Sequence, residues 1–148
     1  MNIIIRTAIE NDLTDILNLY AQPEMDNSSV LSIDDAKNIF NCMKKYPNYM
    51  VYVALIDNVI VGTFALLIMD NLAHLGTPSG IVEDVAVDQK YHGQGIGKQM
   101  MQFAMEKCQK YGCYKLILSS NVKRAQAHRF YESLGFRQHG ISFHVAIE

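Results

Sequence analysis

The sequence predicts an α/β fold in which helices pack on a mixed β-sheet. Three observations predict it: strand-like runs alternate with helix-period runs, two apolar runs flank an Asp-Asn turn, and a glycine-rich segment joins a strand to a helix. The length of 148 residues, of which 49% are hydrophobic, is enough for one domain with a substantial core. We therefore expect a single domain over 1–148, with elements in the order β-α-α-β-β-β-α-β-α-β.

The N-terminal elements are expected to be one strand and two helices. Ile3–Ile5 is a short apolar run, and Asp12–Tyr20 has apolar residues at helical spacing. After a polar loop, Ser32 with Asp35 three positions later predicts the N-terminus of a second helix, which runs to about Lys45.

The middle of the chain is expected to form a hairpin, a strand and a long helix. Residues 49–69 contain two apolar runs on either side of Asp57-Asn58, which is the pattern of a β-hairpin. A loop then leads to a strand at Ile81–Val87. A helix from about Ile96 to Tyr111 follows the glycine-rich segment. Its core side is expected to carry Ile96, Met100, Phe103, Ala104 and Cys108.

The last part of the chain is expected to add two strands and a helix. Tyr114–Ser119 reads as a strand, and Arg124–Leu134 reads as a helix. Phe143–Ile147 alternates apolar and other residues, so we expect a final strand there.

Composition argues against several classes of protein. The formal net charge is −2 without basic runs, so we expect no nucleic-acid partner. No apolar run approaches the roughly 20 residues of a membrane span, and Arg6 comes too early for a secretory signal. Three cysteines without a CxxC pair suit a reducing compartment, so we expect a cytoplasmic protein. The spacing of the five histidines predicts no metal site.

Residues 88–100, DQKYHGQGIGKQM, place glycine at 93, 95 and 97 between a strand and a helix. A Walker A loop does not fit, because His92 and Gln99 occupy positions that need glycine and Ser or Thr. A dinucleotide fingerprint does not fit either, because Lys98 replaces its third glycine. Two interpretations remain: an ordinary loop, or an anion site built from helix-start amides with Lys98 nearby.

The segment His92-Gly93-Gln94-Gly95-Ile96-Gly97 resembles the (Arg/Gln)-x-x-Gly-x-(Gly/Ala) motif of the GNAT superfamily of acyl-CoA N-acetyltransferases, with His92 in place of Arg or Gln. The preceding strand, IVEDVAVDQKY, and the later GCYKLIL resemble the glucosamine-phosphate branch of the family. SSNVKRAQAHRFYESLGF, at 119–136, resembles the second cofactor-side motif, and its NVKR and AHRFY are similar to aminoalkylphosphonate N-acetyltransferases. The two motifs together cover residues 81–136.

This resemblance implies a GNAT-like, mostly antiparallel central sheet with a splayed pair formed by the fourth and fifth strands, flanked by about four helices. It also implies acetyl transfer from the cosubstrate acetyl-CoA to a primary amine. Backbone amides at a helix start suit its pyrophosphate, and an open strand edge suits the peptide-like pantetheine arm. The cofactor-binding residues expected on this basis are Val85, Ala86, Val87, His92, Gly93, Gln94, Gly95, Ile96, Gly97, Lys98 and Asn121.

Three residues are expected to be catalytic. Tyr131 lies where the family's general-acid tyrosine falls and would protonate the leaving thiolate, with ring packing as the alternative. Glu83 and Asp84 are adjacent acids in an apolar strand, and alternation places them on opposite faces. Glu83 is expected to act as the base, directly or through a water, while Asp84 orients a neighbour or meets the ammonium group. The alternative is that these carboxylates are simply solvated.

The sequence leaves more than one interpretation of the acceptor substrate and of the partners. Lys123, Arg124 and Arg129 suit a phosphate or phosphonate on a small amine, the 3′-phosphate of the cofactor, or a solvated helix face. Asn121 resembles the asparagine that contacts pantetheine, and it also suits a helix cap. We expect a small-molecule amine substrate and, by family analogy, a homodimer. The alternatives are a protein or peptide N-acetyltransferase and a non-catalytic acyl-CoA-binding sensor.

Overall fold

The computed structural model describes residues 2–147 and divides into two compact units, one up to Ile117 and one from Leu118 onward. The single domain expected over 1–148 stays a prediction. No helix within the described residues is long and apolar enough to cross a membrane.

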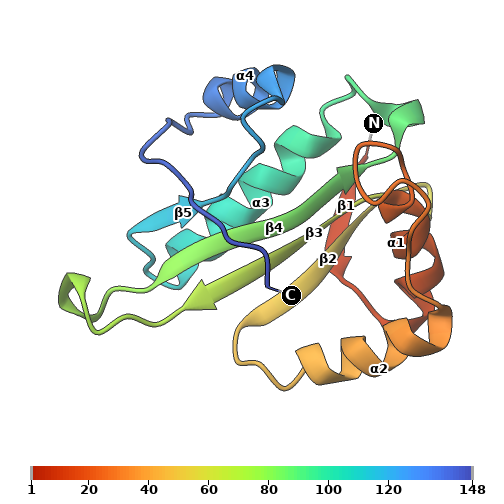
Figure 1. Cartoon of the computed structure of the whole chain (residues 1–148), viewed down its shortest axis with the longest axis horizontal. Helices are drawn as coiled ribbons and strands as arrows, with labels where there is room; N and C mark the ends of the chain where they lie inside the picture. Colours follow the sequence, from red (N-terminus) through yellow and green to blue (C-terminus); the bar gives the residue numbers. More distant parts are fainter. Residues whose placement is uncertain (1, 148) are drawn as a thin grey trace. The chain divides into compact units, whose positions relative to one another are not determined.

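The first unit is built on a five-stranded mixed sheet in the order β1-β2-β3-β4-β5 (Figure 1). Neighbouring strands are antiparallel as far as β4, and β5 lies parallel to β4. This arrangement confirms the mixed, mostly antiparallel sheet that the sequence predicts. The strands are β1 (Ile4–Thr7), β2 (Tyr49–Ile56), β3 (Val59–Met69), β4 (Ser79–Val87) and β5 (Lys115–Ile117).

Helices cover both faces of this sheet. The first unit contains α1 (Leu13–Tyr20), α2 (Ile33–Met43) and α3 (Ile96–Lys110), and the second unit contains α4 (Ala125–Ser133). Short 3₁₀ turns precede α1, β4 and the glycine-rich loop, at Glu10–Asp12, His74–Gly76 and Gln89–Tyr91.

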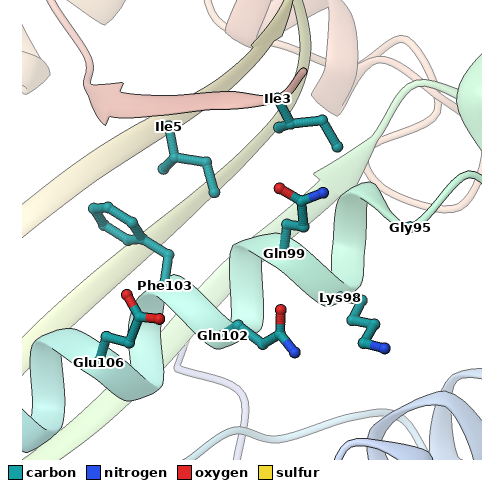
Figure 2. A pocket seen from close by; sticks show the side chains of 8 residues that line it. All are labelled: Ile3, Ile5, Gly95, Lys98, Gln99, Gln102, Phe103 and Glu106. Carbon is teal, nitrogen blue, oxygen red and sulfur yellow. The ribbon is translucent and has the colours of Figure 1, made fainter. Parts of the chain in front are cut away.

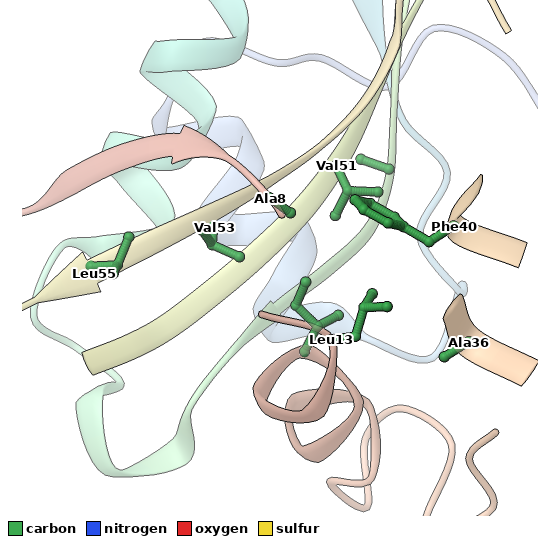
Figure 3. Packing of buried hydrophobic residues seen from close by; sticks show 9 residues of the cluster. Ala8, Leu13, Ala36, Phe40, Val51, Val53 and Leu55 are labelled. Carbon is green, nitrogen blue, oxygen red and sulfur yellow. The ribbon is translucent and has the colours of Figure 1, made fainter. Parts of the chain in front are cut away.

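One face of the sheet packs against α1 and α2 (Figure 3). Strand residues two apart point to the same face, which is why Val51, Val53 and Leu55 of β2 share this cluster. The buried members of the cluster are Ala8, Leu13, Ile16, Ala36, Phe40, Val51, Val53, Leu55 and Ala65.

The opposite face packs against α3. The Tyr52 ring lies 5.2 Å from the Phe64 ring and 5.0 Å from the Phe103 ring of α3, measured between centroids. A side chain at Gly62 would place its Cβ only 2.7 Å from the Met100 sulfur, so glycine there lets the helix approach β3 closely. The fully enclosed residues of α3 include Ile96, Met100, Met101 and Ala104.

Elements with strong local signals are where the sequence predicts them. The Ser32 side chain accepts a hydrogen bond from the Asp35 amide at 3.2 Å, which confirms the helix start. Asp57 and Asn58 have φ values of 49° and 65°, as a two-residue type I′ hairpin turn requires. The predicted helices at 12–20, 96–111 and 124–134 are each within two residues of α1, α3 and α4.

The final strand expected at Phe143–Ile147 is wrong. The described residues there form no strand, and the Phe143, Val145 and Ile147 side chains are 78–91% exposed. Alternation alone does not make a strand, because backbone groups need a ladder partner, and the second unit contains none in residues 118–147. The strand expected at Tyr114–Ser119 is also shorter, since β5 covers only Lys115–Ile117.

The side chain of Asp12, just before α1, forms hydrogen bonds with residues of β1 and of the following loop. Its carboxylate accepts hydrogen bonds from the Arg6 guanidinium at 2.7 and 3.0 Å and from the Ile9 amide at 2.8 Å. Asp12 is 5% exposed, so the ion pair is largely shielded on the carboxylate side. The hydrogen bonds from Arg6 hold the pKa of Asp12 below its ordinary value, although burial opposes this.

Replacing Asp12 by alanine is expected to lower the free energy of unfolding by about 2 kcal/mol at neutral pH, because three hydrogen bonds to a charged group are lost. A carboxylate with a lowered folded-state pKa stabilises the fold above its unfolded pKa of about 3.9, and this contribution disappears as pH falls through the folded value. Urea unfolding at several pH values measures the difference. Glu10→Ala, at an exposed neighbour, is the control. A difference that stays constant down to strongly acidic pH would contradict the assignment.

Candidate active site

The edge of β4 toward β5 is open over most of its length. β4 pairs with β5 only through Ser79–Ile81, opposite Lys115–Ile117. Beyond Ile81 the strand continues to Val87, but β5 ends at Ile117, so residues 82–87 have no partner on that side within the first unit. Val85, Ala86 and Val87 thus lie along a free strand edge, which is the kind of edge that an extended amide-containing ligand can join.

The glycine-rich loop follows directly and ends in the N-terminus of α3. Gly93 and Gly95 have φ values of 76° and 83°, a left-handed conformation that favours glycine. A Cβ added at either position would meet no heavy atom within 4 Å, so the space in front of this backbone is open. The helix begins at Ile96, and the first-turn amides, including those of Gly97 and Lys98, lack acceptors within the helix. The loop therefore has both the open space and the donors of an anion site.

His92 connects this loop to the end of β4. Its Nε2 donates a hydrogen bond to the Val87 carbonyl oxygen at 3.0 Å. Gln22, after α1, donates to the same carbonyl at 3.2 Å and accepts from the Gln89 amide at 2.9 Å. The Val87 carbonyl thus already accepts two hydrogen bonds from within the chain. His92 therefore has a structural role that its position in the motif did not indicate. Nothing in the sequence marks Gln22, since it lies 65 residues away in a polar loop.

A groove of about 510 Å³ lies beside the helix start, between β1 and α3. Figure 2 shows Ile3, which precedes β1, and Ile5 of β1 on the side of the groove opposite Gln99 and Phe103 of α3. Gly95 and Lys98 line one end of this groove, so the start of α3 is accessible from that side as well. The full lining is Ile3, Ile5, Gly95, Lys98, Gln99, Gln102, Phe103 and Glu106.

Glu83 and Asp84 lie at a β-bulge in β4. Ala65 of β3 pairs with Glu83, but Thr63 pairs with Ala86, so Asp84 and the next residue together face one residue of β3. Asp84 has φ of 54°, which is unusual for a residue with a side chain. Both acids are exposed. The bulge interrupts the period-two pattern at these residues, so the expectation that they lie on opposite faces stays a prediction.

Asp84 lies in a partly enclosed and acidic environment. It remains accessible to solvent, but burial of its carboxyl raises the pKa of Asp84, and the charge of Asp26 raises it further. The pKa of Tyr20, at the end of α1, is raised by burial and then by the charge of Asp84. Burial raises the pKa of Tyr49, and the charges of Asp84 and then Glu83 add to this. Asp84 therefore interacts electrostatically with Asp26, Tyr20 and Tyr49, three residues that are distant from it in the sequence.

Tyr131 lies on α4 in the second unit. Its ring centroid is 5.1 Å from that of Phe130 and 5.7 Å from that of Phe136. Burial raises the pKa of the Tyr131 phenol, and the positive charge of Arg124 partly opposes this. The phenol is therefore protonated at neutral pH, as a general acid must be.

Asn121 shapes the turn that precedes α4. Its Oδ1 accepts a hydrogen bond from the Lys123 amide at 2.9 Å, and its carbonyl accepts from His128 Nε2 at 2.8 Å. The carbonyl also accepts from the Arg124 amide at 3.0 Å. Asn121 thus forms a turn before α4, whose N-cap is Arg124 without a side-chain cap, so the helix-capping role that the sequence suggested is wrong. Its contact with pantetheine stays a prediction.

Two features of the first unit suit an extended ligand that carries a phosphate group. A free parallel-strand edge leads directly into a helix start with open space before its backbone. The profile of the Acetyltransferase (GNAT) family matches residues 12–136, and the chain belongs to this family.

Similar proteins carry related names. A Trypanosoma brucei brucei glucosamine 6-phosphate N-acetyltransferase is 42% identical over 80 residues, which cover 54% of this chain and 52% of that protein. A Salmonella typhimurium aminoalkylphosphonate N-acetyltransferase is 33% identical over 68% of this chain and 65% of that protein. The chain thus spans about half to two thirds of these relatives. A solved Agrobacterium tumefaciens structure superposes with a TM-score of 0.91 at 29% identity, covering 97% of this chain and 99% of that one.

Proposed function

We propose that this chain is an acetyl-CoA-dependent N-acetyltransferase that acetylates a small primary amine. The observation that carries the proposal is the open strand edge at Val85 and Ala86, just before the glycine-rich start of α3. Acetyl-CoA would supply the acetyl group as a thioester. A cytoplasmic location and pairing of two copies are parts of the same proposal, and they rest on the unpaired cysteines and on family analogy.

The residues of the first unit suit the binding of such a donor. The strand edge at Val85 and Ala86 can pair with the amides of the pantetheine arm. Gly93 and Gly95 leave room for a pyrophosphate against the backbone, and the amides from Gln94 to Lys98 can donate to it. The side chain of Lys98 adds a positive charge at the same end of α3.

The chemical step needs one group that removes a proton from the ammonium and one that donates a proton to the leaving thiolate. Tyr131 is proposed as the acid because it lies where the general-acid tyrosine of the family falls, and its phenol carries a proton at neutral pH. Of the two acids expected at the site, Asp84 is proposed as the base in preference to Glu83. Its raised pKa makes it the better proton acceptor near neutral pH, and its bulged backbone exposes it. Glu83 then contributes charge that attracts the ammonium.

The proposed base gives a distinct pH dependence. A base is active when deprotonated, so a raised pKa of Asp84 places the acidic limb of the kcat/KM profile above the ordinary aspartate range. Asp84→Asn is expected to lower kcat by about 10²–10⁴-fold and to remove this limb. Glu83→Gln, the neighbouring matched change, is expected to retain it. Loss of the limb in Glu83→Gln but not in Asp84→Asn would reverse the assignment.

The acceptor is proposed to be a small amine that also carries a phosphate or phosphonate. The names of the two relatives support this class, and Lys123, Arg124 and Arg129 are placed on or just before α4 as cationic groups. Arginine binds such oxyanions through paired hydrogen bonds. A peptide acceptor and a sensor without turnover are the competing functions.

A thiol-release assay tests the proposal. The purified chain is incubated with acetyl-CoA and a panel containing glucosamine 6-phosphate, an aminoalkylphosphonate, their uncharged amine counterparts and peptides with free N-termini. We expect release of CoA with the anionic amines above the amine-free control. Release only with peptides would favour the peptide acetyltransferase. Calorimetric binding of acetyl-CoA without release on any amine would favour the sensor and overturn the proposal.

A further inference from the structure

The C-terminal end of α3 forms a Schellman motif with a cysteine at each of its two contact positions. Gly112 has φ of 75°, and its amide donates to the Gln109 carbonyl at 3.1 Å. The Cys113 amide donates to the Cys108 carbonyl at 2.9 Å. These two hydrogen bonds define the motif, in which the side chains corresponding to Cys108 and Cys113 commonly touch.

The two thiols differ in their access to solvent. Both are unpaired, but Cys108 is buried and Cys113 is partly exposed. Burial raises the pKa of the Cys108 thiol to about 12, with further contributions from the charge and hydrogen bonding of Cys113. The pair therefore consists of an accessible thiol and a sheltered thiol that interacts with it.

Cys108 also lies beneath the joined part of the β4–β5 pair. A Cβ added at Gly80 of β4 would collide with the Cys108 sulfur, and it would lie 3.2 Å from Leu116 of β5. Gly80 and Leu116 are register partners in the parallel ladder. The sulfur of Cys108 thus packs where the two strands are still paired, away from the open edge at Val85–Val87.

We propose that Cys113 is a reversible thiol-modification site and that Cys108 is its resolving thiol, so that a low-molecular-weight disulfide converts the pair to a Cys108–Cys113 disulfide. The hydrogen bond of 2.9 Å from the Cys113 amide to the Cys108 carbonyl brings the two residues together across the end of α3, as a disulfide between them requires. Because Cys113 is the accessible member, it reacts first. This inference does not depend on the acetyltransferase activity.

The chemistry balances with glutathione disulfide as the oxidant. The Cys113 thiol loses its proton to solvent, and its sulfur attacks one sulfur of glutathione disulfide, which breaks that bond and releases one glutathione thiolate. The Cys108 thiol then loses its proton, which its raised pKa makes the slower step, and its sulfur attacks the Cys113 sulfur of the mixed disulfide and releases the second thiolate. Both thiolates take up protons from solvent. Two protein thiols are oxidised, and one glutathione disulfide is reduced to two glutathiones.

Mass spectrometry of the full chain tests the proposal. A Cys42→Ser background removes the exposed third cysteine, and the chain is incubated with glutathione disulfide and then digested. We expect a product lighter by two hydrogen atoms, in which the peptides containing Cys108 and Cys113 are linked and which dithiothreitol reverses. In Cys108→Ala the glutathione adduct on Cys113 should persist, because no resolving thiol remains.

Two controls accompany this experiment: a variant without Cys113 and the exposed Cys42 of the unaltered chain. Cys113→Ala changes a partly exposed residue, and with it Cys108 should take up no glutathione. The chain with all three cysteines provides an internal reagent control, since exposed Cys42 should form an adduct. The proposal is overturned if Cys42 reacts while Cys113 does not. A persistent adduct on Cys113 with Cys108 intact would also overturn it.

Discussion

Replacing Gly95 by valine is expected to weaken acetyl-CoA binding by at least about a hundredfold, which corresponds to the loss of one to three charge-assisted hydrogen bonds. Gly95 has φ of 83°, a conformation that a β-branched residue resists. Valine would either rotate the peptide, which turns the helix-start amides away from the pyrophosphate, or place its methyl groups in the open space before the loop. Isothermal titration calorimetry with acetyl-CoA measures the change.

Gly112→Val is the matched control at the other end of α3. Gly112 has a similar φ of 75° and also has no heavy atom within 4 Å of a built Cβ. Both variants should therefore lose a similar amount of stability, about 1–3 kcal/mol for a strained backbone position. Only Gly95→Val should lose acetyl-CoA. Equal affinity of Gly95→Val and the unaltered chain, or equal loss in both variants, would remove the loop from the binding site.

Features specified by neighbouring residues could be predicted from the sequence. The helix start at Ser32, the Asp57-Asn58 turn and the glycine loop each depend on residues within a few positions of one another. The positive φ values of Gly93 and Gly95 are also local, because glycine adopts this conformation readily. The motif at 119–136 belongs to this group, since the helix it predicts is α4.

Features that depend on distant residues could not be predicted. The bulge at Asp84 arises from register between β3 and β4, and no rule of alternation within β4 reports it. The hydrogen bond from Gln22 to Val87 joins residues 65 positions apart. Asp26 affects Asp84 from a loop after α1 that reads only as polar. The base that we propose from the structure, Asp84, therefore differs from the Glu83 expected from the sequence, while the proposed donor loop is the same in both.

The final strand was predicted wrongly because its local pattern was present but its distant pairing partner was not. Phe143–Ile147 has the local pattern of a strand, but pairing requires backbone groups from another segment. Within residues 118–147 no such segment is in a strand conformation. An alternating hydrophobic pattern indicates which face a strand would bury, but it does not show whether another strand lies beside it to pair with.

Tyr131→Phe is expected to lower kcat by about 10²–10⁴-fold, which is the range for loss of a general acid. The KM for acetyl-CoA should change little, because the lost hydroxyl acts on the leaving sulfur during the reaction and not on the bound donor. The raised pKa of Tyr131 also places the basic limb of the unaltered enzyme's kcat/KM profile above the ordinary tyrosine value of about 10. Steady-state kinetics across alkaline pH measure both effects, with exposed Tyr111→Phe as the control.

The phenylalanine variant separates catalysis from packing at Tyr131. It keeps the ring that lies 5.1 Å from Phe130 and 5.7 Å from Phe136, so a purely structural role predicts no change in turnover. An acid role instead predicts a fall in kcat at an unchanged melting temperature, because only the proton donor is removed. A variant with unaltered kcat and an unaltered alkaline limb would leave Tyr131 as a packing residue of α4. The proton for the leaving thiolate would then have to come from another group or from solvent.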